Sequence, residues 1–454
     1  MNVLVEGFDP DARALARFLV GEGSSVRIAS GSHDAGEVAV LRDLGIMVET
    51  GVDLDRDPGP ADVAYLDVWT PEIASRVQRL RAQGTRISCL GDLLLERWHG
   101  PTIGITGTAG KTTTTSLVAS ILRAGGTEVA MSAGARAGNL WPTGELLDVL
   151  TGKAGTTERV LLLELTSSHL AFMRSSPTIA AIVSFWPDHL ELHGDLEHYR
   201  AAKATIATHQ RAGDALVLNA DDASAGFAAG ARGHVVQFSL LRPVRQGAYR
   251  RSGSELVLAR PSGDEIEVRV PLDASVHPGN LVAAAAIAAA AGAGSSDIET
   301  GITGASPLPY RARPVGMLLG LTVVDDGMAA TPAKTSALLR GYADRSIVLI
   351  AGGAGDAGGG PVHATPDEGE LLQRACDEIV RAARVVVVFG PAGLRLAAML
   401  VARGVDVVAT DTLETAVATA ARAGDGATAI VFSPLFPVSL EERLGFEALV
   451  ARQQ

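Results

Sequence analysis

A glycine-rich stretch, Gly104-Ile-Thr-Gly-Thr-Ala-Gly-Lys-Thr-Thr-Thr-Thr115, constrains the fold and the chemistry of this chain more than any other segment. It predicts a short apolar strand that ends near Ile105, then a loop, then a helix over residues 112–123. Gly107 and Gly110 let backbone N–H groups approach an anion, and the helix N-terminus adds a positive dipole end. This order of elements is typical of a phosphate-binding loop.

The side chains of the stretch support the same interpretation. Lys111 can neutralise charge on the β- and γ-phosphates, and the Thr112 hydroxyl can ligate Mg²⁺. The first glycine of the general pattern is replaced by Ile105. The nucleotide contacts that we expect here come from Gly107, Thr108, Gly110, Lys111, Thr112 and Thr113. The alternative is a glycine-rich strand–helix turn that binds no nucleotide.

Length and composition exclude several classes of protein. The 454 residues suffice for about three domains, and 47% hydrophobic with 20% charged residues is typical of a globular protein. A net charge of −12 without any Lys/Arg-rich run argues against nucleic acid or an anionic membrane as partner. The N-terminus lacks a signal-peptide pattern, and the apolar stretch 282–294 is too short to cross a bilayer. With only Cys89 and Cys376, we expect a cytoplasmic protein without a disulfide framework.

Strands and helices alternate along the whole chain, which predicts the α/β class. Three parts are expected, over residues 1–98, 99–306 and 307–454. The first strand is followed by Gly7-Phe-Asp-Pro10 and not by Gly-x-Gly-x-x-Gly, so no NAD site is expected there. Residues 354–360, within a run rich in glycine, are expected to form a mobile loop.

Two side chains follow apolar strands in the second part. Glu164 ends the run Leu-Leu-Leu-Glu, and His189 comes shortly after the strand at 179–184. At the carboxyl edge of a parallel sheet, beside a phosphate loop, Glu164 could hold Mg²⁺ and His189 could bind a metal or a substrate phosphate. The alternatives are a glutamate that caps the next helix and a structural histidine.

Lysine is scarce, because the 39 basic residues include only Lys111, Lys153, Lys203 and Lys334. A lysine retained in such an arginine-rich chain can mark a need for a primary amine, although chance retention is the alternative for each one. In isolation Lys203, in Tyr199-Arg-Ala-Ala-Lys203, would be a surface residue of a helix.

Taken in order, these motifs resemble those of the ATP-dependent Mur ligases. The resemblance rests on residues 107–113, Glu164-Leu-Thr-Ser167, Asp188-His189, Tyr199 with Lys203, Asn219-Ala-Asp-Asp222, His277 with Asn280, and Tyr310-Arg311. It implies a Rossmann-like N-terminal domain for a nucleotide sugar, a central P-loop ATPase domain with a parallel sheet, and a Rossmann-like C-terminal domain for an amino acid.

The resemblance also implies roles for single residues. Lys111, Glu164, His189 and Lys203 would be catalytic. Lys203 would be carbamylated by CO₂ and, with Thr112, Glu164 and His189, would hold two Mg²⁺ ions. Asn280, Arg311 and Asp326 would hold the adenine and ribose of ATP. Substrate contacts are implied for Asn139, Thr166, His189, Ser439, Leu440 and Phe446, of which the last three match residues lining a glutamate pocket.

One departure from the family concerns charge. The family pattern Asn-Asp-Ser-Lys-Ala-Thr appears here as Asp325-Asp-Gly-Met-Ala-Ala330, so that Met328 replaces a lysine that contacts the incoming amino acid. The loop 353–357 also lacks the family's second lysine. Lys334 could replace the missing charge, although a helix-surface role is the alternative.

The chain is therefore expected to be an ATP-dependent, amide-forming ligase that works through an acyl phosphate. The expected reaction adds glutamate or a related amino acid to UDP-N-acetylmuramoyl-L-alanine for peptidoglycan. One alternative is a family member that joins a different acid and amine, and another is an idle nucleotide-binding or scaffold protein. Partners would be small molecules only, and the protein would be a monomer.

Overall fold

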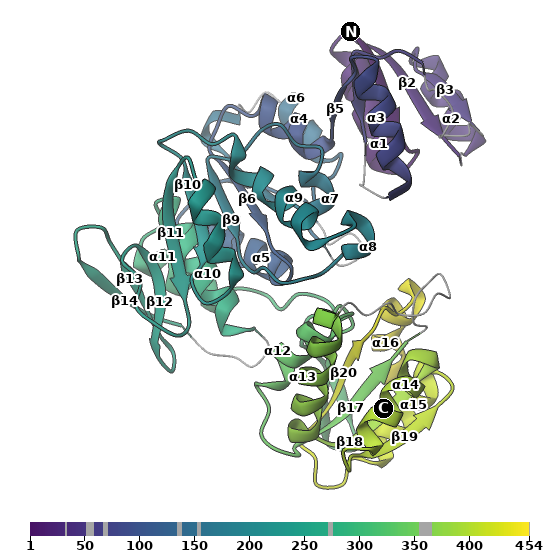
Figure 1. Cartoon of the computed structure of the whole chain (residues 1–454), viewed down its shortest axis with the longest axis vertical. Coiled ribbons are helices and arrows are strands. Elements are labelled where there is room, and N and C mark those ends of the chain that lie inside the picture. Colours follow the sequence, from purple (N-terminus) through teal and green to yellow (C-terminus); the bar gives the residue numbers. More distant parts are fainter. Residues whose placement is uncertain are drawn as a thin grey trace. The chain divides into compact units, whose positions relative to one another are not determined.

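The chain, seen here as a computed structural model, is described over residues 1–31, 34–50, 59–66, 71–133, 139–151, 156–270, 276–353 and 366–453. It divides into two compact units. Figure 1 colours the chain from the N-terminus to the C-terminus, so that each unit can be followed along the sequence. The first comprises Met1–Pro271 and Pro278–Ala305, and the second Leu272–His277 and Ser306–Gln454. The predicted loop at 354–360 and Lys153 lie outside the described residues. The boundaries at 98 and 306 stay predictions.

Five parallel strands form the first sheet, in the order β3-β2-β1-β4-β5. The strands are β1 (Asn2–Glu6), β2 (Ser25–Ser30), β3 (Met47–Thr50), β4 (Val63–Tyr65) and β5 (Arg86–Ser88). The helices are α1 (Pro10–Gly21), α2 (Ala35–Asp43), α3 (Pro71–Ala82) and α4 (Leu90–Arg97). Residues 3–5 of β1 are all buried, as expected of a parallel strand covered on both faces.

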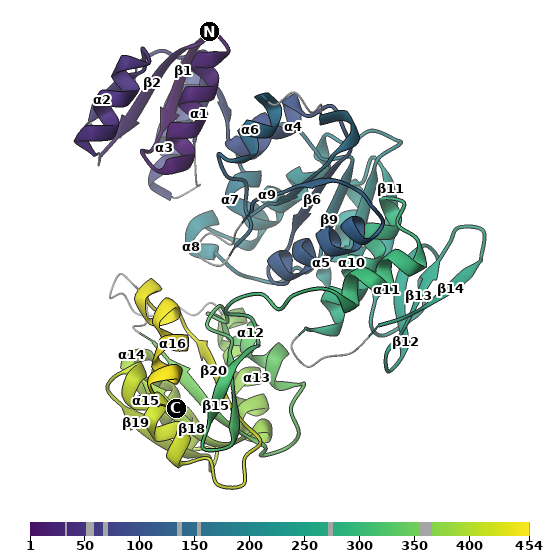
Figure 2. The same ribbon diagram turned by 180° about the vertical axis from the view of Figure 1, so that it is seen from behind.

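Nine strands form the second sheet, in the order β14-β13-β12-β11-β10-β9-β6-β8-β7. The strands are β6 (Thr102–Thr106), β7 (Val129–Ala130), β8 (Val160–Glu164), β9 (Ile179–Ile182), β10 (Ala215–Asn219), β11 (His234–Ser239), β12 (Gly247–Ser252), β13 (Glu255–Ala259) and β14 (Glu265–Arg269). The helices are α5 (Lys111–Ala124), α6 (Leu146–Thr151), α7 (Ser167–Leu170), α8 (Leu190–His193), α9 (Leu196–Thr208), α10 (Pro278–Ala290) and α11 (Ser295–Thr303). Figure 2 shows α5, α10 and α11 beside one another.

The predicted parallel sheet is confirmed for the strands from β12 to β7. The carboxyl ends of β6, β8 and β9 therefore meet at one edge. Two further strands, β13 and β14, are antiparallel and were not predicted. The short connection from β12 to β13 contains Gly253 and that from β13 to β14 contains Gly263, both with positive φ, and connections this short can join only antiparallel neighbours.

Six strands form the third sheet, in the second unit, in the order β15-β16-β20-β17-β18-β19. The strands are β15 (Arg313–Leu318), β16 (Leu321–Asp325), β17 (Ile347–Gly352), β18 (Ala383–Phe389), β19 (Asp406–Thr410) and β20 (Ala429–Leu435). The helices are α12 (Pro332–Leu339), α13 (Pro366–Ala382), α14 (Gly390–Val401), α15 (Leu413–Arg422) and α16 (Leu440–Gln453). Only β15 is antiparallel to its neighbour. The chain continues from β17 to β18 on one side and returns to β20 on the other, so the strand order reverses between β17 and β20.

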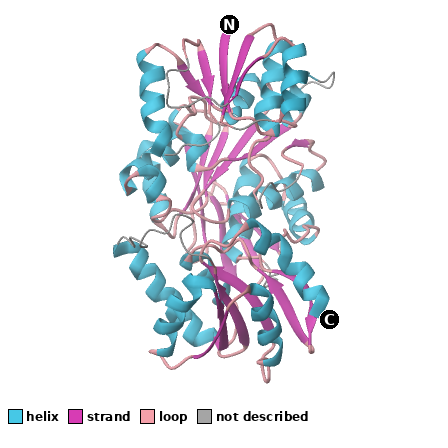
Figure 3. Cartoon of the chain, turned by 90° about the vertical axis from the view of Figure 1, so that its right-hand side faces the viewer, coloured by secondary structure: helices cyan, strands magenta, loops and turns pink. Residues whose placement is uncertain are grey.

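Helices flank the strands on both sides, as Figure 3 shows, and the predicted α/β class is confirmed. Within the described residues, none of the helices combines the length and the apolar character that a membrane-spanning segment needs.

A buried carboxylate joins the first sheet to the second within the first unit. Asp92 in α4 is fully buried and accepts the Ser88 hydroxyl at 2.9 Å. Its other oxygen accepts the backbone N–H groups of Arg174 and Ser175 at 3.0 and 2.9 Å, between α7 and β9. These three hydrogen bonds satisfy the buried charge.

Candidate active site

The predicted phosphate loop connects β6 to α5. Gly110 precedes the helix in a left-handed conformation, with φ of 82°, and no side chain caps the first turn. The first N–H groups of α5 therefore point toward the place where an anion would bind. The fit around Gly110 is close, because a Cβ built on it would lie 2.5 Å from Asn280 Oδ1 in α10. This contact places Asn280, expected at the nucleotide, directly against the loop.

Replacing Gly110 with alanine is expected to weaken ATP binding by roughly tenfold or more, because a left-handed non-glycine residue costs about 1–3 kcal/mol and the new methyl group would displace Asn280. Isothermal titration with ATP measures the effect. Gly126→Ala is the matched control, since Gly126 also has positive φ, at 78°, but has no atom within 4 Å of the added carbon. Equal ATP affinity of the Gly110 variant and wild type would contradict this reasoning.

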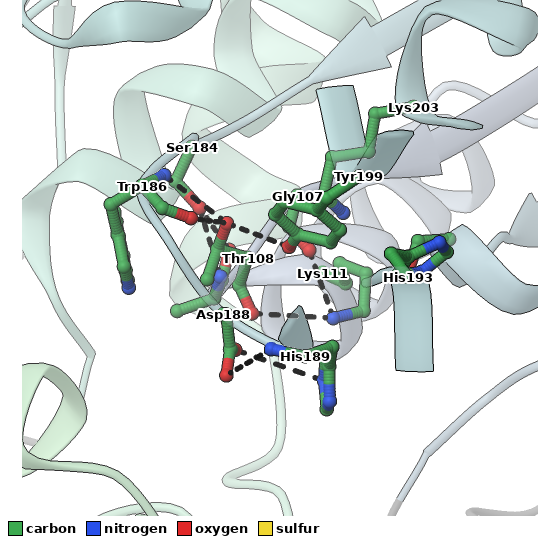
Figure 4. A network of polar contacts seen from close by, with 12 residues as sticks. Gly107, Thr108, Lys111, Ser184, Trp186, Asp188, His189, His193, Tyr199 and Lys203 are labelled. Atoms are coloured by element: carbon green, nitrogen blue, oxygen red, sulfur yellow. Dashed lines mark hydrogen bonds and ion pairs between the residues drawn. The ribbon is translucent and has the colours of Figure 1, made fainter. Parts of the chain in front are cut away.

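Lys111, the first residue of α5, lies over the loop. Its ammonium group donates to the carbonyl oxygens of Gly107 and Thr108 at 3.0 and 3.5 Å, as Figure 4 shows. The next side chain, Thr112, is buried, and its hydroxyl donates to Asn139 Oδ1 at 3.3 Å. Asn139, predicted at the substrate, thus contacts the phosphate-loop helix. Thr113 follows on α5 and is half-buried.

Three hydroxyl side chains hold the loop in place, and the sequence had not singled out one of them, Ser184. The Ser184 hydroxyl, after β9, accepts the Ala109 N–H at 2.9 Å and donates to the Ala109 carbonyl oxygen at 2.8 Å. The hydroxyl groups of Thr108 and Tyr199 are 3.0 Å apart, and the Tyr199 ring is fully buried. The loop is therefore anchored to β9 and to α9, the helix that also carries Lys203.

Glu164 ends β8 and is fully buried. Its Oε2 accepts the Leu140 N–H at 2.9 Å, whereas its Oε1 has no hydrogen-bond partner among the described residues. The alternative that Glu164 caps the next helix is wrong, because α7 is capped by Thr166. A buried carboxylate oxygen without a donor favours a cation close by.

Lys203 is buried, with 1% of its surface exposed, so the alternative of a surface lysine is wrong. Its Nζ donates to Thr106 Oγ1 at 3.4 Å, at the end of β6, and lies 4.8 Å from the centre of the Tyr199 ring. Burial lowers the pKa of the Lys203 amine well below its usual value, and the positive charge of Lys111 lowers it further. The neutral amine is therefore favoured, beside the phosphate loop.

His189 follows β9 at the same sheet edge and has a left-handed backbone, with φ of 54°. Its ring is half exposed, and its Nε2 lies 3.7 Å from Asp188 Oδ2. Figure 4 shows His189 and Lys111 around the same loop. Among the described residues, no three His, Cys, Asp or Glu side chains form a metal cluster. The predicted metal ligands are of a different kind, because only Glu164 and His189 belong to these residue types. The other two are the Thr112 hydroxyl and the carbamate expected on Lys203.

Thr166, predicted at the substrate, has a local structural role. Its hydroxyl accepts the His169 N–H at 3.3 Å, and His169 Nδ1 lies 3.0 Å from the same oxygen. Burial lowers the pKa of His169 to about 4, so the ring is neutral at pH 7. The two side chains thus fix the turn that follows Glu164.

The remaining predicted residues belong to the second unit. Asp326 accepts the Ser433 hydroxyl at 2.9 Å and the Ala312 N–H at 3.2 Å; burial raises its pKa to about 7, against the effect of nearby Arg311. Ser439 and Glu442 form reciprocal hydrogen bonds that cap α16. Leu440 is 52% exposed, whereas Phe446 is fully buried and stacked on Phe432 at 4.4 Å.

Comparisons with known proteins agree with this geometry. The sequence profile of the Mur ligase middle domain matches residues 105–288. A UDP-N-acetylmuramoylalanine–D-glutamate ligase of Symbiobacterium thermophilum is 34% identical, covering 77% of this chain and 76% of that relative. The enzyme of the same name from Koribacter versatilis is 28% identical, covering 95% and 92%.

The fold is also found among solved structures. The MurF ligase of Thermotoga maritima, in complex with ADP, matches with a TM-score of 0.62 at 16% identity, covering 95% of this chain and 96% of that one. At this identity the match concerns the fold alone. The profile match spans the phosphate loop and Lys203, and a relative more than 30% identical aligns over three quarters of both chains. This chain belongs to the Mur ligase family of ATP-dependent, amide-forming ligases.

Proposed function

We propose that this chain adds glutamate or a closely related amino acid to UDP-N-acetylmuramoyl-L-alanine in the cytoplasm, with ATP as the energy source. The observation that carries the proposal is the buried amine of Lys203, at the end of the strand that leads into the phosphate loop. The curated relatives named above support the choice of substrates. The three predicted parts would then hold the nucleotide sugar, ATP and the amino acid, within a monomer.

The residues around the loop fit Mg²⁺. Glu164 offers a buried carboxylate oxygen to which no described residue donates, and Thr112 offers a hydroxyl group. Both are hard oxygen ligands of the kind that Mg²⁺ prefers. Bound there, Mg²⁺ would neutralise charge on the phosphate oxygens of ATP.

The chain's own residues would position the reacting groups. Lys111, already over the loop, would contact the transferring γ-phosphate, and the N–H groups of the first turn of α5 would bind the other phosphate oxygens. The carboxylate of the acid substrate would attack the γ-phosphorus, giving an acyl phosphate and ADP. The amino group of the amino acid would then attack the acyl carbon and release phosphate.

Lys203 would act after reaction with CO₂. A neutral amine attacks the carbon of CO₂, one proton leaves the nitrogen, and the result is a carbamate whose single negative charge is shared by two oxygens. The lowered pKa of Lys203 supports this step, because burial disfavours the protonated amine, whose lone pair is not available. The carbamate would supply the second Mg²⁺ with oxygen ligands and, together with His189, position the acyl phosphate.

A second candidate, a family member that acts on a different acid, is favoured by one observation. The first turn of α1 carries two carboxylates: Asp9 accepts the Ala12 N–H at 2.8 Å, and Asp11 accepts the Gly144 N–H at 2.8 Å. Helix N-termini in doubly wound sheets are common diphosphate sites, and these carboxylates would repel a diphosphate bound at α1.

A phosphate-release assay tests both candidates. The full chain, ATP and Mg²⁺ are combined with UDP-N-acetylmuramoyl-L-alanine and single amino acids, and products are identified by mass spectrometry. The proposal predicts phosphate release that depends on both substrates, highest with glutamate or a close relative. Amide formation only with acids that lack a diphosphate would favour the second candidate. Phosphate release that needs no acceptor would contradict both.

A further inference from the structure

One arginine of the second unit contacts Met328, the residue at which the sequence lacks the lysine expected from the resemblance. Arg443 is in the first turn of α16, the helix that follows β20. Its Nη1 donates to Met328 Sδ at 3.1 Å, and Met328 follows β16, the strand paired with β20. Both residues therefore lie at the carboxyl edge of the third sheet, near the reversal of strand order where ligands of such sheets bind.

The backbone at this edge makes room for the arginine. A Cβ built on Gly327 would lie 3.3 Å from Arg443 Cγ, 3.2 Å from the Phe432 ring and 3.2 Å from Asp325 Oδ1. A larger residue at 327 would therefore push against the stem of Arg443. The stem of Arg443 thus fits beside Gly327, and its guanidinium group reaches Met328.

The contact itself is one that a carboxylate could improve. A thioether sulfur is a weak hydrogen-bond acceptor, whereas a carboxylate accepts two parallel hydrogen bonds from a guanidinium group. Arg443 is half-buried, so a ligand carboxylate would reach it in a partly desolvated setting where the pair is stronger than in water.

Both positive and negative side chains surround this contact. Asp325, buried beside Gly327, has its pKa raised to about 6 by burial; Arg313 and Arg443 oppose that rise, and Glu447 adds to it. Glu447 forms an ion pair with Arg313. Arg443 thus lies beside Met328, which by the resemblance takes the place of the family's lysine.

We propose that Arg443 binds the side-chain carboxylate of the incoming amino acid and thereby selects an acidic amino acid such as glutamate. This inference rests on the proposed function for the identity of the second substrate. The charge missing at Met328 is supplied from α16, and Lys334 is not needed for it.

The test compares Arg443→Met with wild type and with Arg452→Met. The control residue lies at the other end of α16, is 64% exposed, and pairs with Glu414 at 3.8 Å. The KM for glutamate should rise roughly 10- to 100-fold in Arg443→Met, as expected for loss of charged hydrogen bonds. The KM for ATP should stay unchanged, and the preference for glutamate over glutamine should disappear. The control should match wild type.

A second variant separates binding from folding. Adding Met328→Lys to Arg443→Met restores a cation at the same place, so the glutamate KM should fall back by at least about tenfold. An unchanged glutamate KM in Arg443→Met, or a loss on Lys334→Met instead, would overturn the inference.

Direct binding distinguishes this inference from the proposed function. Saturation-transfer NMR with glutamate reports binding without turnover. A signal in wild type that Arg443→Met loses supports the inference even if amide formation fails with UDP-N-acetylmuramoyl-L-alanine. Equal signals in both proteins, or no signal in either, overturn it.

Discussion

Replacing Lys203 with arginine is expected to reduce amide formation by roughly 100-fold or more, the loss that corresponds to several kcal/mol of transition-state stabilisation. Arginine does not form the carbamate, and its guanidinium group would stay charged in a place where only 1% of the lysine is exposed. Coupled phosphate release measures turnover, and isothermal titration should show that ATP still binds.

Two further measurements identify the cause of that loss. Lys203→Ala leaves space for a small carboxylate, so added propionate should restore part of the activity if a carbamate is the working group. Wild type treated with ¹³C-bicarbonate should show a carbamate carbon by NMR that the alanine variant lacks. Lys334→Arg, the matched control on α12, should retain full activity. Full turnover of Lys203→Arg would refute the carbamate hypothesis.

Replacing Glu164 with glutamine is expected to lower turnover by about 100- to 1,000-fold while leaving thermal stability unchanged or higher. The amide oxygen can still accept the Leu140 N–H, so the local structure should persist. The buried charge, whose Oε1 has no donor among the described residues, would be removed. Half-maximal activation should also need a higher Mg²⁺ concentration.

Stability decides between a metal ligand and a structural glutamate. If Glu164 only stabilises the fold, the variant should unfold at a lower temperature and activity should fall in proportion to the folded fraction. Differential scanning calorimetry together with a Mg²⁺ titration of turnover distinguishes the two roles. Unaltered Mg²⁺ dependence with reduced stability would count against Glu164 as a ligand.

Most of the fold could be predicted because its signals are local. The phosphate loop, the strands at 160–164 and 179–182, and the alanine-rich helix α10 combine apolar runs with clear starts and stops. The antiparallel strands β13 and β14 were missed, although Ser-Gly turns flank both of them. The pairing of these strands depends on the direction in which the chain turns back, and a run of apolar residues does not predict that direction.

The burial of Lys203 could have been found from spacing. Tyr199, Ala202, Lys203 and Ile206 occur at intervals of three and four along α9, and all are buried. The helical period alone therefore places the lysine on the inner face. By contrast, the contact of Ser184 with the loop joins residues 75 apart, and that of Arg443 with Met328 joins residues 115 apart. No local pattern indicates such contacts.

The glutamate pocket expected from the resemblance stays a prediction. Phe446 matched a pocket residue, yet its ring is fully buried against Phe432. The residue three positions earlier, Arg443, projects from the same helix toward the sheet edge. Resemblance transfers a residue's place along the helix, whereas the burial and contacts of its side chain come from the structure.

The buried carboxylate of Asp92 determines whether the predicted parts of the chain can be separated. A fragment that starts at residue 99, the predicted boundary, would lose the acceptor for the N–H groups of Arg174 and Ser175. It would also lose Trp98, whose indole N–H donates to the Arg159 carbonyl oxygen at 3.1 Å. The part that begins at residue 99 therefore depends on contacts from α4 and Trp98. Exchange of N-terminal segments between relatives, in evolution or by engineering, would have to keep α4 together with the loop whose N–H groups Asp92 accepts.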